Sequence, residues 1–330
     1  MAAAAVIPMR RVPITLLLGL FVILVAEAFL FADVHLSHRG AVRDAWQAEA
    51  VLLNQPTTNL GWAARGMAVN MTPVAWAGYL LAMEGLLRWQ PGGSPVRRRP
   101  HHFWLLCLAS VFIWCVFDAI NFHGVGGTGM RAWTYIGLPP NLSDKFVPYL
   151  LAFGSIVPGM LMSGQAMLNA GWFDWARCSA WSVPRWAEVV GLLAGVAMFV
   201  WPLVRPDPIT NLTLWTSLVF LLDPINDALG RPSMFRDWRN GWYGRSLAAM
   251  AGGLACGLLW EFWNYWALTK WTYHLPFLGA WGNRFHYFEM PLPGLLGFLP
   301  FGLECWVMWQ TMRIALDGLT EPLPDERTLL

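Results

Sequence analysis

The chain of 330 residues is too apolar for a water-soluble protein. Hydrophobic residues make up 56% of it and charged residues only 13%, and its mean hydropathy is +0.44. So few charged residues cannot cover the surface of a soluble protein of this length. The composition predicts an integral membrane protein. The net charge of +2 is spread over short loops, and no nucleic-acid signature is present.

Eight apolar stretches are long enough to cross a bilayer, which takes about 20 residues. We expect transmembrane helices near residues 13–32, 72–90, 103–122, 145–165, 186–203, 210–228, 246–268 and 290–314. The first stretch is too long for a signal peptide, and Glu27-Ala28-Phe29 is a poor cleavage site, so we interpret it as a retained helix. The polar segment after it is expected to hold a short interfacial helix around Ala41 to Leu53.

The distribution of basic residues predicts the orientation. With the N-terminus in the cytoplasm, 14 of the 22 Lys and Arg residues lie on the cytoplasmic side, including Arg97-Arg98-Arg99. We therefore expect a multi-pass protein of the inner membrane with both termini in the cytoplasm. None of the five cysteines is placed for an exported disulfide, so all are expected to be packing residues.

Several short motifs occur twice in the same order. The chain contains Asp118-Ala119-Ile120-Asn121 followed by Trp133-Thr134-Tyr135, and Glu261-Phe262-Trp263-Asn264 followed by Trp271-Thr272-Tyr273. Upstream, Asn70-Met71-Thr72 and Glu84 correspond to Asn211-Leu212-Thr213 and Asp223. All of these matches have offsets of 138 to 143 residues. The shared order and spacing predict an internal duplication.

In this duplication, the first four expected helices correspond in order to the last four. The predicted fold is an all-α polytopic membrane protein of about eight transmembrane helices in two parallel four-helix repeats. The repeats cover residues 1–168 and 169–316, and a short cytoplasmic tail covers 317–330. Because four is an even number, both repeats cross in the same sense and their motifs lie on the same side. Duplicated membrane proteins commonly place the functional site between the halves.

Three acidic residues inside or at the edge of the expected helices have an asparagine three residues later. The pairs are Asp118 with Asn121, Asp223 with Asn226, and Glu261 with Asn264. A carboxylate in the hydrocarbon region costs roughly 2.5 to 3.5 kcal/mol on insertion scales, so it needs a partner or a role. One interpretation is a hydrogen-bonded clamp between helices. The other is a proton donor or acceptor.

Glu261 is the leading candidate for the second interpretation because Trp260, Trp263 and Trp266 flank it. A carboxyl group in an apolar site can stay protonated near neutral pH and deliver a proton, and aromatic faces stabilise a carbocation. Packing and anchoring at the membrane interface would also explain the tryptophans. We predict Glu261 and Asp118 as catalytic acids oriented by Asn264 and Asn121. The predicted substrate lining is Trp263, Trp271, Tyr273, Trp133 and Tyr135.

Four further polar residues are secondary candidates: Asp223, Asn226, Glu289 and Glu304. Glu289 lies near His286 and can be a solvated loop partner, whereas Glu304 lies deeper and can bond a neighbouring helix or take part in chemistry. Only His35 and His38 approach the spacing of metal ligands, and no phosphate-binding glycine loop is found. We therefore expect no metal and no cofactor.

The segment from Trp271-Thr272-Tyr273 through Glu289-Met290-Pro291 to Phe298 resembles the carotenoid hydratase and membrane lycopene cyclase group. A fainter resemblance runs from Trp133 to Pro158. That group combines a Trp-x-Tyr or similar aromatic segment with a proline-led helix start. The resemblance implies acids that act on the ends of linear carotenoids.

The leading expectation is an integral membrane enzyme, a lyase or isomerase, that performs cofactor-independent hydration or cyclisation of an apolar isoprenoid-like or carotenoid-like lipid. A proton-coupled transporter or permease would use the same buried acids. A non-catalytic subunit of a larger membrane complex would use the tryptophans as contact surface. The expected partners are a membrane lipid or lipophilic substrate, and a second copy or another subunit of a membrane complex.

Overall fold

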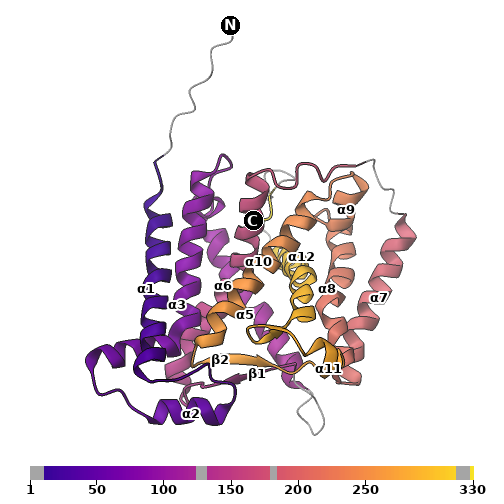
Figure 1. Cartoon of the computed structure of the whole chain (residues 1–330). Coiled ribbons are helices and arrows are strands. Elements are labelled where there is room, and N and C mark those ends of the chain that lie inside the picture. The colour runs from indigo at the N-terminus through magenta and orange to yellow at the C-terminus, as the bar shows by residue number, and fades with distance from the viewer. Residues whose placement is uncertain (1–10, 124–131, 179–183, 317–327) are drawn as a thin grey trace.

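Long helices that run side by side dominate the computed structural model, which describes residues 11–123, 132–178, 184–316 and 328–330 (Figure 1). The α-helices are α1 (Ile14–Leu36), α2 (Ala45–Leu53), α3 (Asn59–Trp89), α4 (Pro95–Arg98), α5 (Pro100–His123), α6 (Leu142–Asn169), α7 (Arg185–Val204), α8 (Pro208–Ala228), α9 (Met234–Arg239), α10 (Gly244–Trp266), α11 (Gly279–Gly282) and α12 (Phe298–Ala315). Two 3₁₀ helices, η1 (Pro276–Leu278) and η2 (Leu292–Gly297), lie between α10 and α12.

Six stretches of the described chain are long and apolar enough to cross a membrane: α1, α5, α6, α7, α10, and η2 with α12. The protein is therefore a membrane-embedded helical protein, as the composition predicts. The other two expected spans fall on the long helices α3 and α8, of 31 and 21 residues, which are not among the six. The expected interfacial helix is α2, which begins after Asp44, whose side chain accepts the Gln47 N–H at 2.8 Å.

Two short antiparallel sheets lie at one end of the helices, where the sequence predicted only loops. β1 (Trp133–Ile136) pairs with β2 (Lys270–Tyr273), and β3 (His286–Tyr287) pairs with β4 (Met290–Pro291). Figure 1 shows β1 and β2 running across the ends of the long helices. The all-α prediction missed these strands, although aromatic and β-branched residues such as those of Trp-Thr-Tyr favour strands.

The two halves have the same order of helix packing. α1 packs on α3, α3 on α6 and α5 on α6, while α7 packs on α8, α8 on α12 and α10 on α12. The halves meet along α6 and α10. Glycines allow this close approach, because a Cβ at Gly252 would lie 2.2 Å from the Met160 carbonyl oxygen and one at Gly164 would lie 2.5 Å from that of Ala248.

α3 is kinked near Asn70 and Pro73. Asn70 has non-helical angles of φ −108° and ψ 19°, and Pro73 lacks the N–H that would bond one turn back. Close to the kink, the Ala68 carbonyl oxygen accepts the N–H of Leu268, at 2.8 Å, from the segment between α10 and β2. The kink thus ties α3 of the first half to the second half.

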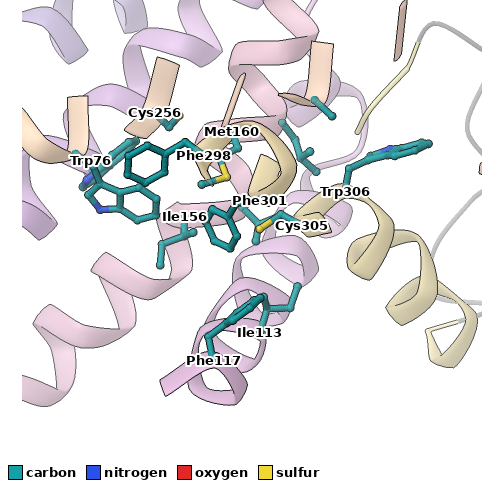
Figure 2. Packing of buried hydrophobic residues seen from close by; sticks show 14 of the residues in the cluster. Trp76, Ile113, Phe117, Ile156, Met160, Cys256, Phe298, Phe301, Cys305 and Trp306 are labelled. Carbon is teal, nitrogen blue, oxygen red and sulfur yellow. The ribbon is translucent and has the colours of Figure 1, made fainter. Parts of the chain in front are cut away.

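α12 lies in the centre of the bundle, and most of its residues are buried. Figure 2 shows Phe298 and Phe301 of α12 among Ile156 of α6 and Phe117 of α5. The rings of Phe301 and Phe117 meet edge to face with their centroids 5.5 Å apart. A helix that is buried all round belongs in a core. At the C-terminus, residues 317–327 of the expected tail lie outside the described chain, and Leu329 is buried with its N–H donating to Gln165.

Candidate functional site

A cavity of about 460 Å³ lies beside β1 and β2 and is lined by residues of both halves. Its volume falls in the usual range for small-molecule sites, which are mostly apolar with a few polar groups. The lining includes five tryptophans: Trp114, Trp133, Trp215, Trp260 and Trp271. The kinked part of α3 contributes Pro73, and the start of α12 contributes Phe298 and Phe301. The break in α3 and the passage from η2 into α12 therefore both shape the cavity.

Asp118 of α5 lies behind the cavity wall and bonds side chains that line it. The Tyr135 hydroxyl donates to Asp118 Oδ1 at 3.0 Å, and the Trp133 indole N–H donates to the same oxygen at 3.0 Å. The Trp114 indole N–H donates to the Tyr135 oxygen at 2.9 Å. Asp118 is thus held by a tyrosine and a tryptophan of β1.

Glu261 of α10 has the corresponding contact with β2. The Tyr273 hydroxyl donates to Glu261 Oε1 at 2.7 Å, and the Trp271 indole N–H donates to the Tyr273 oxygen at 2.8 Å. Glu261 is fully buried, and its Oε2 has no hydrogen-bond partner among the described residues. Asp118 with Tyr135 and Glu261 with Tyr273 are called the acid–tyrosine pairs below.

The phenols of the acid–tyrosine pairs remain proton donors. Burial raises the pKa of Tyr135 and of Tyr273 well above the ordinary value, and the neighbouring carboxyl groups act in the same direction. Tyr135 and Tyr273 are among the lining residues of the cavity, whereas Asp118 and Glu261 are not. A ligand in the cavity would therefore meet the tyrosines first and the acids only through them.

The two predicted asparagines hold the strands rather than the acids. Asn121 donates to the Trp133 carbonyl oxygen at 2.9 Å and accepts the Ala132 N–H at 3.0 Å. Asn264 donates to the Trp271 carbonyl oxygen at 2.8 Å and accepts the N–H of the same residue at 2.9 Å. Each asparagine thus fixes the backbone of one strand. The tyrosine of that strand bonds the acid that lies one helical turn before the asparagine.

Trp263 does not line the cavity, unlike the other four predicted lining residues. Its ring lies edge to face against Trp76, with the centroids 5.2 Å apart, and its indole N–H donates to Glu27 Oε1 at 3.0 Å. Glu27 lies inside α1 and was not identified as a site residue from the sequence. Trp263 therefore packs α10 against α1 and α3.

Asp223 and Asn226 join elements of the second half. Asp223 accepts the backbone N–H groups of Met234 and Phe235 at 2.8 and 3.0 Å, at the N-terminus of α9. Asn226 of α8 donates to the Val307 carbonyl oxygen of α12 at 3.1 Å. These contacts match the clamp interpretation of an acid and an asparagine at this spacing.

Glu304 and Glu289 also have structural partners. Glu304 is fully buried in α12, accepts the Leu218 N–H at 3.0 Å through Oε1, and has no partner for Oε2 in the described chain. Glu289 lies in the turn between β3 and β4 rather than on a helix, and it forms an ion pair with Lys270. Burial lowers the pKa of Lys270, and the pairing with Glu289 acts against that shift.

The site also contains residues that were not singled out from the sequence, among them Trp114, Trp215 and Lys145. In a chain with 22 tryptophans, an isolated Trp carries little positional signal. Pro73 is the second residue of the helix expected over 72–90, where a proline is tolerated, so it did not indicate the kink inside the longer α3.

Comparison with known proteins finds no matching family model, no similar curated protein and no similar solved structure.

Proposed function

We propose that the chain is an integral membrane enzyme that hydrates or cyclises an isoprenoid-like lipid by acid/base chemistry in the aromatic cavity. One observation carries the proposal. The ring of Tyr273 lines an apolar cavity while its hydroxyl is bonded to the fully buried Glu261. A proton source at the wall of an apolar cavity is what protonation of an unactivated alkene requires.

In this mechanism, Tyr273 is the group that touches the substrate and Glu261 supplies the proton from behind it. For this transfer the phenol O–H turns from Glu261 Oε1 toward the alkene, and the protonated carboxyl group donates to the phenol oxygen in its place. The phenol then gives its proton to one alkene carbon while it receives the carboxyl proton of Glu261, so no phenolate accumulates. The raised pKa of Tyr273 favours this concerted transfer over a free phenolate. Glu261 is left as a carboxylate, and the second alkene carbon becomes a carbocation.

The aromatic lining then acts on the carbocation. Faces of Trp, Tyr and Phe rings attract a cation by roughly 0.5 to 2 kcal/mol each. In hydration, a water oxygen bonds to the cation and its proton passes through Tyr135 to the Asp118 carboxylate. In cyclisation, a second alkene of the same lipid bonds to the cation, and the proton lost from carbon takes the same route. Either path moves one proton from the Glu261 pair to the Asp118 pair, and this proton must return to Glu261 before the next turnover.

The matched contacts of the two halves support the internal duplication as part of this proposal. Thr134 lies opposite Thr272 with their hydroxyl oxygens 3.1 Å apart, and an antiparallel pairing relates its strands by a twofold rotation. In this proposal the same rotation would relate the acid–tyrosine pairs, and the shared order of helix packing in the two halves supports it. We propose that the repeats of residues 1–168 and 169–316 are related by an axis near the membrane normal.

The first prediction concerns the product of the reaction. In a deletion strain that carries plasmid copies of the gene, Glu261→Gln and Tyr273→Phe should lower the product in lipid extracts by at least about 100-fold, because general acid catalysis contributes that much or more. Mass spectrometry of the extracts measures this loss. Glu304→Gln is the matched control, since it changes another fully buried helix glutamate that does not line the cavity.

Normal product from the Glu261→Gln variant would refute the proposed proton source. A deletion strain whose lipids are unchanged, but which loses uptake of a solute or assembly of a membrane complex, would refute the enzyme and favour the transporter or the subunit. Thermal unfolding of each purified variant in detergent separates loss of chemistry from loss of fold.

A further inference from the structure

The chain has 22 basic residues, and only two of them, Lys145 and Lys270, are lysines. Both lysines line the aromatic cavity. No Asp or Glu is found among the described lining residues, and no Arg either. The cavity therefore combines an apolar interior with two positive charges and no opposing charge in its wall.

The ammonium group of Lys270 is already occupied by the protein. It is fully buried and donates to the carbonyl oxygens of Val42 and Tyr265, at 3.1 and 2.8 Å, and to the carboxylate of Glu289. An ammonium group has three donors, so these bonds satisfy it completely. Lys270 holds the loop before α2 and the turn between β3 and β4 against β2.

The ammonium group of Lys145 is in the opposite situation. Lys145 is half-buried in the first turn of α6 and has neither an ion pair nor a side-chain hydrogen bond with the part of the chain that the structure describes. The adjacent carboxylate of Asp144 accepts from Asn141 and Ser143 instead, each at 3.1 Å. Among the described lining residues, Lys145 is thus a cation whose donors are not used by the protein.

We propose that the lipid bound in this cavity has an anionic head, a phosphate or a carboxylate, that pairs with Lys145. The inference rests on the proposed function for the apolar chain of the ligand and adds the chemistry of its polar end. Lys145 lies in the first turn of α6, close in sequence to β1, whereas Phe153 and Ile156 line the cavity about two to three turns further along the same helix. An amphiphile would therefore place its head at Lys145 and its chain among the aromatic rings.

Binding of three probes with one chain and different heads tests this proposal. Geranylgeranyl phosphate, geranylgeranoic acid and geranylgeraniol are titrated against the full chain in phosphatidylcholine nanodiscs, with affinity measured by calorimetry. We expect at least one anionic probe to bind about tenfold or more tightly than the alcohol, because hydrogen bonds to charged groups are the stronger class. Whichever anion binds more tightly identifies the head as phosphate or carboxylate.

Variants assign the preference to one side chain. Lys145→Gln should reduce the affinity for the anionic probe to that for the alcohol, and Lys145→Arg should keep the preference. Arg43→Gln is the matched control, because Arg43 is an exposed cation between α1 and α2 that does not line the cavity. Equal affinities for all three probes, or a preference that survives in Lys145→Gln, would overturn the proposal. Selective binding combined with unchanged lipids in the Tyr273→Phe strain would retain this inference and refute only the chemistry.

Discussion

One sequence pattern, an acid with an asparagine three residues later, leads to different structural roles in this protein. Asp223 accepts backbone N–H groups of α9, whereas Asp118 and Glu261 accept phenols that line a cavity. The spacing on the helix is the same, so it cannot distinguish the roles. A Trp-Thr-Tyr segment follows Asp118 and another follows Glu261, and this segment distinguishes the two roles. The tyrosine of each segment donates a hydrogen bond to the preceding acid.

At the scale of single residues, the ion pair of Lys270 and Glu289 gives a stability prediction. Lys270→Met should lower the free energy of unfolding by about 3 kcal/mol, because it leaves the carboxylate of Glu289 without its partner. Chemical denaturation in detergent, followed by circular dichroism, measures the loss. The double variant Lys270→Met/Glu289→Gln should be more stable than the Lys270→Met variant. Losses that add up across the two sites would show that the pair is not coupled.

The helices could be predicted from the sequence more fully than the strands could. Each predicted apolar interval overlaps a long helix of the structure, since the apolar stretch is a local signal. The pairing of β1 with β2 joins residues more than 130 positions apart, and each strand has only four residues. Nothing within either segment specifies its partner. The cavity was missed for the same reason, because it is built from segments that only the tertiary fold brings together.

The β1–β2 register can be tested by cross-linking. In a Thr134→Cys/Thr272→Cys variant, mild oxidation should join the two residues, because their hydroxyl oxygens lie 3.1 Å apart across the strand pair. Peptide mapping by mass spectrometry distinguishes this disulfide from bonds to the five native cysteines. Thr134→Cys/Thr269→Cys should not cross-link, because Thr269 precedes the residue that pairs with Ile136. A disulfide in the control but not in the test pair would disprove the register.

At the scale of the whole molecule, the contact between the halves places the candidate site. α6 and α10 approach closely through glycines, and the strand that follows each acid crosses to the other half. The sequence repeat led to both acids. It also led to five predicted lining residues, of which four line the cavity. It could not show that tyrosines separate the acids from the cavity, because that depends on how β1 and β2 pair.

The number of membrane crossings is the last prediction. The three residues 205–207 connect α7 to α8, and such a short link makes neighbouring helices antiparallel, so α8 should return across the membrane that α7 crosses. α3 has 31 residues and a length of about 46 Å, more than the bilayer core of about 30 Å. We therefore expect eight crossings.

Reporter fusions after residues 55, 206 and 278 should indicate the outside, and fusions after 95, 175 and 240 the cytoplasm. Signals on one side after 55 and 95, or after 206 and 240, would limit the crossings to the more apolar helices. A cytoplasmic signal after 278 would contradict the predicted orientation.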